Sequence, residues 1–119
     1  MRRFIVAALL MLGSAQALAH GHLQSSTPAE GSVIETAPET LTLDFSEALE
    51  TALSDVTLTD AQGKTIAIGE LAAEDDDASI VNLELPELAP GTYRVTWQVT
   101  SIDTHRSEGE FTFQVAGDD

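Results

Sequence analysis

Apolar and polar residues alternate with a period of two through most of the chain after residue 20. The alternation is most regular at 93–100, where Tyr93, Val95, Trp97 and Val99 are separated by polar residues. This period is typical of a β-strand that buries one face. Six further stretches with strand character are 23–26, 40–45, 56–59, 64–68, 80–85 and 111–115.

These seven short strands, separated by turn residues and without a helical period, predict an all-β fold. We expect a seven-stranded antiparallel Ig-like Greek-key β-sandwich. The run Leu-Ala-Pro-Gly-Thr-Tyr at 88–93 is similar to the tyrosine corner of such sandwiches, in which a tyrosine hydroxyl bonds to the backbone upstream. The acidic segment 69–77 has no periodicity, so we predict a solvated loop there.

The beginning of the chain has the features of a secretion signal. Two arginines precede an apolar run at 4–12, and the small-x-small triplet at 17–19 suits a signal peptidase. The apolar run is too short for a membrane-spanning helix, which needs about 20 residues. We therefore predict a cleaved signal peptide at 1–19 and one exported domain at 20–119 that is not membrane-inserted once processed.

Composition narrows the possible partners of the processed chain. Loss of two arginines with the signal leaves three cations against 20 acidic residues, a formal charge of −17. Such a surface repels nucleic acid and attracts cations, so we expect no nucleic-acid partner. There is no cysteine, and both methionines lie within 1–19, so thiolate and thioether metal sites are excluded. We expect a monomer.

The histidines indicate a metal site. Cleavage before His20 would give that residue a free α-amine beside its imidazole, a bidentate nitrogen chelate. Asp103 and His105 lie two residues apart between the two best-defined strands, and such side chains point the same way in an extended segment. Together these residues supply three nitrogen atoms and one carboxylate oxygen. That donor set suits a tetragonal Cu(II) ion.

Three alternative hypotheses remain open. A free N-terminus with His22 at its third position could bind Cu(II) or Ni(II) without any folded scaffold. The amine and imidazole of His20 also resemble the histidine brace of copper oxygenases, although the small domain and the lack of an exposed aromatic platform argue against an enzyme. A plain Ig-like adhesion or assembly domain would bind no metal. The first and third hypotheses leave the pair Asp103 and His105 without a role.

Several short motifs give the chain a family resemblance. In order, they are His-x-His-Leu at 20–23, Ser-Ser-Thr-Pro-Ala-Glu-Gly at 25–31, Leu-x-Phe-Ser-Glu at 43–47, Leu-x-Pro-Gly-Thr-Tyr at 88–93, Trp-x-Val at 97–99 and Ser-x-Asp-x-His at 101–105. With these motifs the chain resembles the CopC family of copper-resistance proteins. Without a methionine cluster, it is similar to the branch of the family that binds only Cu(II).

The resemblance implies a periplasmic, non-enzymatic Cu(II)-binding β-sandwich that serves copper resistance. Its ligands would be His20, Asp103 and His105, and Glu47 would lie near the metal as a hydrogen-bond partner. In that case His22 would be a pendant or outer-shell residue. We expect the protein to buffer copper or to deliver it to an inner-membrane copper transporter or an outer-membrane partner.

Overall fold

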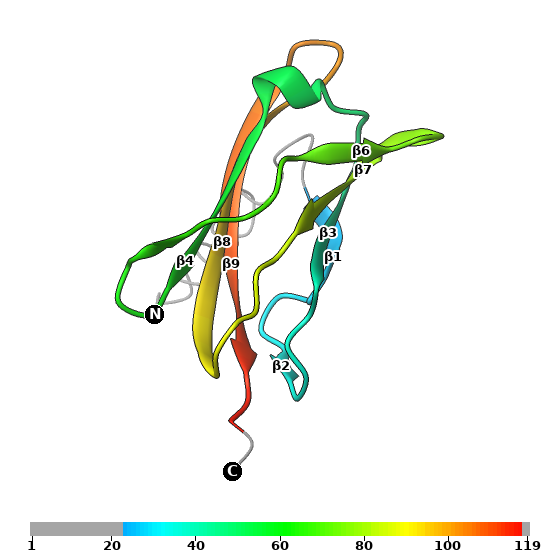
Figure 1. The fold of residues 1–119 in the computed structure, drawn as a ribbon. Coiled ribbons are helices and arrows are strands. Elements are labelled where there is room, and N and C mark those ends of the chain that lie inside the picture. Colours follow the sequence, from blue (N-terminus) through cyan, green and yellow to red (C-terminus); the bar gives the residue numbers. More distant parts are fainter. Residues whose placement is uncertain (1–22, 118–119) are drawn as a thin grey trace, which may run out of the picture.

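The computed structural model describes residues 23–117, which form two β-sheets packed face to face (Figure 1). The smaller sheet has the strand order β1-β3-β7-β6, and the larger has the order β2-β9-β8-β4-β5. The strands are β1 (Leu23–Thr27), β2 (Val33–Ile34), β3 (Thr40–Phe45), β4 (Asp55–Asp60), β5 (Thr65–Ile66), β6 (Ala72–Glu74), β7 (Asp77–Glu84), β8 (Gly91–Thr100) and β9 (Arg106–Val115). Within residues 23–117, one 3-10 turn, η2 (Thr51–Leu53), precedes β4. The predicted β-sandwich is confirmed.

The core lies between the two sheets and is built from the alternating apolar positions. Leu41, Leu43 and Phe45 of β3 are fully buried, and they face the buried positions of β8 across the interior. The rings of Phe45 and Trp97 meet edge to face, with centroids 5.9 Å apart. Removal of this apolar surface from water is the main force that holds the sheets together.

The tyrosine corner is present as predicted. The Tyr93 hydroxyl donates a hydrogen bond to the backbone carbonyl of Ala89 at 2.6 Å. Its ring stacks on Phe113, with centroids 5.7 Å apart. These contacts fix the chain where it crosses from β7 in the smaller sheet to β8 in the larger one.

The strand count differs from the prediction, because the described residues form nine strands instead of seven. The two additional strands are β2, which pairs in parallel with β9, and β6, which pairs with β7. They have two and three residues, and none of these residues is buried. A strand that is so short and so exposed shows no alternation of apolar and polar residues. For this reason the prediction of a loop over 69–77 was wrong at Ala72–Glu74, which form β6.

The longest strand pair determines where the site is formed. Strands β8 and β9 pair in continuous register from Gly91 with Val115 to Thr100 with Arg106. Only residues 101–105 remain to connect them, as a short loop at one end of the sandwich (Figure 1). No helix within residues 23–117 has the length and apolar character needed to cross a membrane.

Candidate metal centre

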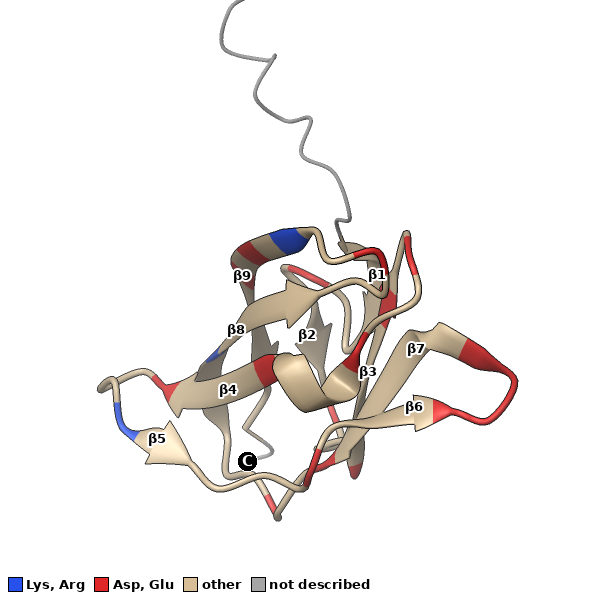
Figure 2. Cartoon of the chain, turned by 90° about the horizontal axis from the view of Figure 1, so that it is seen from above, with Lys and Arg blue, Asp and Glu red and all other residues tan. Residues whose placement is uncertain are grey.

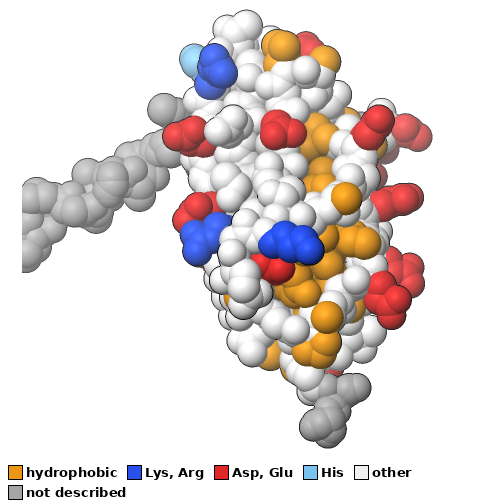
Figure 3. Space-filling view, turned by 60° about the vertical axis from the view of Figure 1, so that its left-hand side comes forward, with side chains coloured by type: hydrophobic (Ala, Val, Ile, Leu, Met, Phe, Trp, Pro, Cys, Tyr) orange, Lys and Arg blue, Asp and Glu red, His pale blue; other side chains and the backbone are white. Residues whose placement is uncertain are grey.

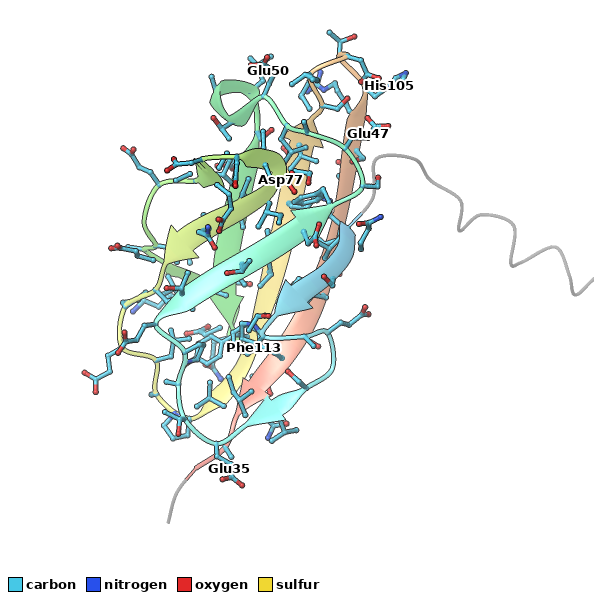
Figure 4. All side chains as sticks on the ribbon, turned by 90° about the vertical axis from the view of Figure 1, so that its right-hand side faces the viewer. Glu35, Glu47, Glu50, Asp77, His105 and Phe113 are labelled. Carbon is cyan, nitrogen blue, oxygen red and sulfur yellow. The ribbon has the colours of Figure 1, made fainter. Side chains whose placement is uncertain are left out.

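Three potential metal ligands gather at the end of the sandwich where β8 and β9 are connected. Asp103 and His105 lie in that loop, and Glu47 lies in the segment after β3. One ligand atom from each lies within 4.8 Å of those of the other two. Figure 4 shows Glu47 and His105 at this end and Glu35 at the opposite one. Within the described residues, no other set of three histidine or acidic side chains converges in this way.

The loop at 101–105 brings Asp103 and His105 together through a tight turn. The Ser101 N–H donates to the His105 carbonyl at 2.8 Å, and the Thr104 N–H donates to the Ser101 carbonyl at 2.8 Å. Thr104 has a φ of 71°, in the left-handed region that non-glycine residues seldom adopt. The predicted convergence is therefore present, but it comes from this turn and not from an extended backbone.

Asp103 and His105 face each other at the surface. The His105 Nδ1 atom lies 3.4 Å from the Asp103 Oδ1 atom, and the two side chains are 68% and 59% exposed. The histidine side chain is visible at the surface beside a basic side chain in Figure 3. The carboxylate can serve as a second ligand beside the imidazole, or as the partner that orients it. A metal ion can reach both groups directly from solvent.

The carboxyl group of Asp103 is held in its ionised form. The Ser101 hydroxyl donates a hydrogen bond to Asp103 Oδ1, and this bond is the main reason that the pKa of Asp103 lies below its ordinary value. Desolvation opposes the shift, whereas the charge of His105 and backbone N–H groups reinforce it. An ionised carboxylate is the form that binds a metal.

Glu47 reaches the site through backbone bonds between two distant segments. The Ile102 N–H donates to the Ala48 carbonyl at 3.0 Å, and the Glu50 N–H donates to the Thr100 carbonyl at 2.8 Å. These bonds join the segment after β3 to the loop between β8 and β9. Sequence reasoning from the residues alone missed Glu47, because no local pattern links it to His105. Only the resemblance to a family indicated it.

One carboxylate oxygen of Glu47 is buried without a hydrogen-bond partner among the described residues. Burying a polar atom without a partner costs about 1–3 kcal/mol, and more for a charged group. The atom belongs to the same side chain that converges with Asp103 and His105. A cation, or a donor group bound to one, would satisfy it. The donor chemistry of the three residues, two carboxylates and an imidazole, fits Cu(II) and gives no soft ligand for Cu(I).

The acidic run at 74–77 does not form a comparable group. Glu74 accepts a hydrogen bond from Asn82, and Asp77 accepts two from Ser79. The Ser79 bonds lower the pKa of Asp77. All four side chains are exposed, and Figure 2 shows the turn between β6 and β7 as an acidic surface segment.

His20 and His22, predicted as a ligand and as an alternative or outer-shell residue, lie outside the described residues. The structure does show where the described chain begins. Leu23, the first residue of β1, pairs with Phe45 at the end of β3. Phe45 is two residues before Glu47, so the chain enters the sandwich at the end that carries the candidate metal centre.

Comparison with known proteins gives consistent similarities. The family model described as the CopC domain matches residues 23–116. Copper resistance protein C of Pseudomonas syringae pv. tomato is 39% identical over 111 residues, covering 88% of this chain and 87% of the relative. The crystal structure of CopC from Methylosinus trichosporium OB3b has a TM-score of 0.78 at 29% identity, with 84% and 97% covered. That of PcoC, a methionine-rich copper resistance protein from Escherichia coli, has a TM-score of 0.72 at 36% identity, with 82% and 99% covered.

Proposed function

The chain belongs to the CopC family, and from this premise we propose that it is a copper-binding protein of copper resistance that holds Cu(II). The observation that carries the proposal is the convergence of Glu47, Asp103 and His105 within 4.8 Å. It brings together residues from two segments that are far apart in the sequence.

In the proposed site, His20 supplies its α-amine and imidazole, and Asp103 and His105 supply a carboxylate oxygen and an imidazole nitrogen. Bound copper is the cargo, and these side chains determine its coordination. The unpartnered oxygen of Glu47 accepts a hydrogen bond from the amine or from a copper-bound water. The ligand set has one negative charge, which partly neutralises the ion.

The length of chain before β1 supports this ligand set. His20 lies three positions before Leu23 in the sequence, and an extended chain of that length spans up to about 10 Å. Leu23 pairs with Phe45, which is two residues, or at most about 7 Å, from Glu47. The amine of a chain that begins at His20 can therefore reach the three converging side chains.

The proposed cellular role rests on the signal peptide predicted at 1–19 and on the exposed position of the site. We place the processed protein in the periplasm, where it buffers copper or delivers it to an inner-membrane transporter or an outer-membrane partner. Asp103 and His105 are more than half exposed, so an acceptor can approach the ion without unfolding the loop. In this role the protein is a carrier and not an enzyme.

The test is the Cu(II) affinity of the protein that begins at His20, measured by competition with a chelator of known affinity. The variant His105→Ala should lose more than the roughly 10–100-fold that an outer-shell residue contributes. The control His22→Ala should bind within a few-fold of wild type. If His22→Ala abolishes binding while His105→Ala does not, the copper is held by the N-terminal tail alone.

A further inference from the structure

Ser101 is the most deeply buried polar side chain among the described residues, with 3% of its surface exposed. It is the first residue of the Ser-x-Asp-x-His motif, directly after β8. Its two neighbours in the motif, Asp103 and His105, are exposed and carry the candidate ligand atoms. A buried hydroxyl needs hydrogen-bond partners, and those of Ser101 are these two residues.

The Oγ atom of Ser101 contacts both residues at once. It donates its proton to Asp103 Oδ1 and accepts the backbone N–H of His105 at 3.1 Å. A hydroxyl has a single proton to donate. The carboxylate receives it, because the other available acceptor, the His105 carbonyl, is 3.4 Å away. One oxygen atom thus fixes the side chain of Asp103 and the backbone of His105.

The main chain of Ser101 adds two further bonds to the same turn. Its N–H donates to His105 and its carbonyl accepts from Thr104, each at 2.8 Å. The turn has the unfavourable φ of 71° at Thr104, so it needs such bonds to persist. The backbone of Ser101 forms an isolated antiparallel β-bridge with Leu49, which lies in the same segment as Glu47. It therefore connects the exposed ligands to the rigid sheet.

We propose that Ser101 is a positioning residue, whose hydroxyl holds Asp103 and His105 in the arrangement that receives the metal. This inference rests on the proposed function, because it assumes that the two residues bind Cu(II). Without the hydroxyl, the Asp103 side chain regains rotamer freedom and the His105 N–H loses its partner. The Asp103 side chain and the His105 backbone then have to become ordered when the metal binds. The entropy lost in this ordering lowers the affinity for the metal.

The chain offers a matched control for this inference. Ser79 also donates its hydroxyl proton to an aspartate two residues away, Asp77, at 2.6 Å. That pair flanks Ala78, whose carbonyl accepts the Leu49 N–H, but neither of its residues belongs to the group of Glu47, Asp103 and His105. The variant Ser79→Ala removes the same type of bond without touching the motif.

The experiment compares wild type, Ser101→Ala, Ser101→Thr and Ser79→Ala, all beginning at His20. We expect Ser101→Ala to bind Cu(II) about 10–100-fold more weakly, with a broadened electron paramagnetic resonance (EPR) spectrum from mixed ligand geometries. Ser101→Thr, which keeps the hydroxyl, should recover most of the affinity, and Ser79→Ala should match wild type. Equal affinities and spectra for wild type and Ser101→Ala would overturn the inference and leave the proposed function standing. Failure of wild type itself to bind Cu(II) would instead refute the proposed function.

A second measurement needs no variant and so does not depend on whether Ser101→Ala folds. In the metal-free protein, amide hydrogen exchange should be slow at His105, whose N–H donates to Ser101 Oγ. The neighbouring N–H of Thr104 donates to a backbone carbonyl and should be similarly protected. Exchange at His105 as fast as in an unstructured peptide would show that Ser101 does not hold this residue.

Discussion

The Nδ1 atom of His105 lies 3.4 Å from the Oδ1 atom of Asp103, in a loop of five residues that joins the two longest strands. The backbone turn and the Ser101 hydroxyl hold the two side chains in this relationship. Glu47 completes the group from a segment more than fifty residues earlier. Each member of the group can be tested separately.

The pH dependence of Asp103 follows from its hydrogen bond to Ser101. Its pKa is lowered in the folded protein, whereas the unfolded value is about 3.9. The stability that it contributes is therefore fully present above that unfolded value and is lost as the pH falls through the folded pKa. The pKa of Asp103, measured by NMR of the carboxyl carbon, should be low in wild type and rise in Ser101→Ala. Asp77, whose pKa is lowered by Ser79, should titrate identically in both proteins. An unchanged Asp103 titration in Ser101→Ala would contradict this assignment.

Acidification should release copper before Asp103 is protonated. Imidazoles and α-amines are in general stronger bases than carboxylates, so protons compete with the metal for the nitrogen ligands first. We therefore expect Cu(II) release on acidification to begin well above pH 4. A release curve that coincides with the titration of Asp103 would show that the carboxylate, and not the nitrogen ligands, controls retention of the metal.

Glu47→Gln should separate metal binding from folding. The Glu47 oxygen has no hydrogen-bond partner within residues 23–117, so the substitution should leave the metal-free melting temperature unchanged or slightly raised. Cu(II) affinity should fall by about tenfold, as for loss of an outer-shell partner. Glu50→Gln is the matched control, because Glu50 is exposed and lies in the same segment. Equal losses in both variants would indicate a general effect of charge and no specific role for Glu47.

Gly109→Ala should destabilise the fold without altering the ligands. Gly109 pairs with Trp97, and a Cβ atom there would lie 2.7 Å from the Cη2 atom of the indole ring. We expect a loss of about 1–3 kcal/mol in the free energy of unfolding, measured with denaturant and the fluorescence of the single tryptophan. In the control Gly117→Ala, the added Cβ would make only ordinary contact with Pro90, at 3.6 Å. Equal stability of the two variants would mean that the indole can move aside freely.

Much of the fold could be predicted because each of the seven predicted strands has at least one apolar position packed on the interior. The strand β3 is an example. Its alternating apolar residues in the sequence, Leu41, Leu43 and Phe45, are its buried residues in the structure. The strands β2 and β6 also pack one apolar residue each, Ile34 and Ala73, against the core, but with two and three residues they are too short for an alternation to be visible in the sequence. Tyr93 was predictable because its hydrogen bond to Ala89 is local, four residues away.

In the candidate metal centre, too, contacts that are local in the sequence were predictable, and contacts between distant segments were not. Asp103 and His105 lie two positions apart, so the sequence indicated that they could converge, although it did not reveal the turn through which they do so. Glu47 joins them through a backbone bond between Ala48 and Ile102, a contact between distant segments that spacing cannot reveal. The role of Ser101 depends on its burial and its hydrogen bonds, and these become visible only in the folded chain.

Retention of one extra residue before His20 should weaken the site. In a protein that begins at Ala19, the nitrogen of His20 is an amide, which must lose a proton before it can bind the metal. We expect Cu(II) affinity at least about tenfold lower than for the protein that begins at His20, with an unchanged metal-free melting temperature. Equal affinity for both proteins would remove the α-amine from the ligand set.

The most direct measurement is the EPR spectrum of one equivalent of Cu(II) bound to the protein that begins at His20, recorded for wild type and His105→Ala. We predict a tetragonal spectrum with nitrogen ligands in wild type, and a spectrum that changes or disappears in His105→Ala. An identical spectrum in the variant would contradict a copper site at the folded end of the sandwich, because His105 could not then be a ligand.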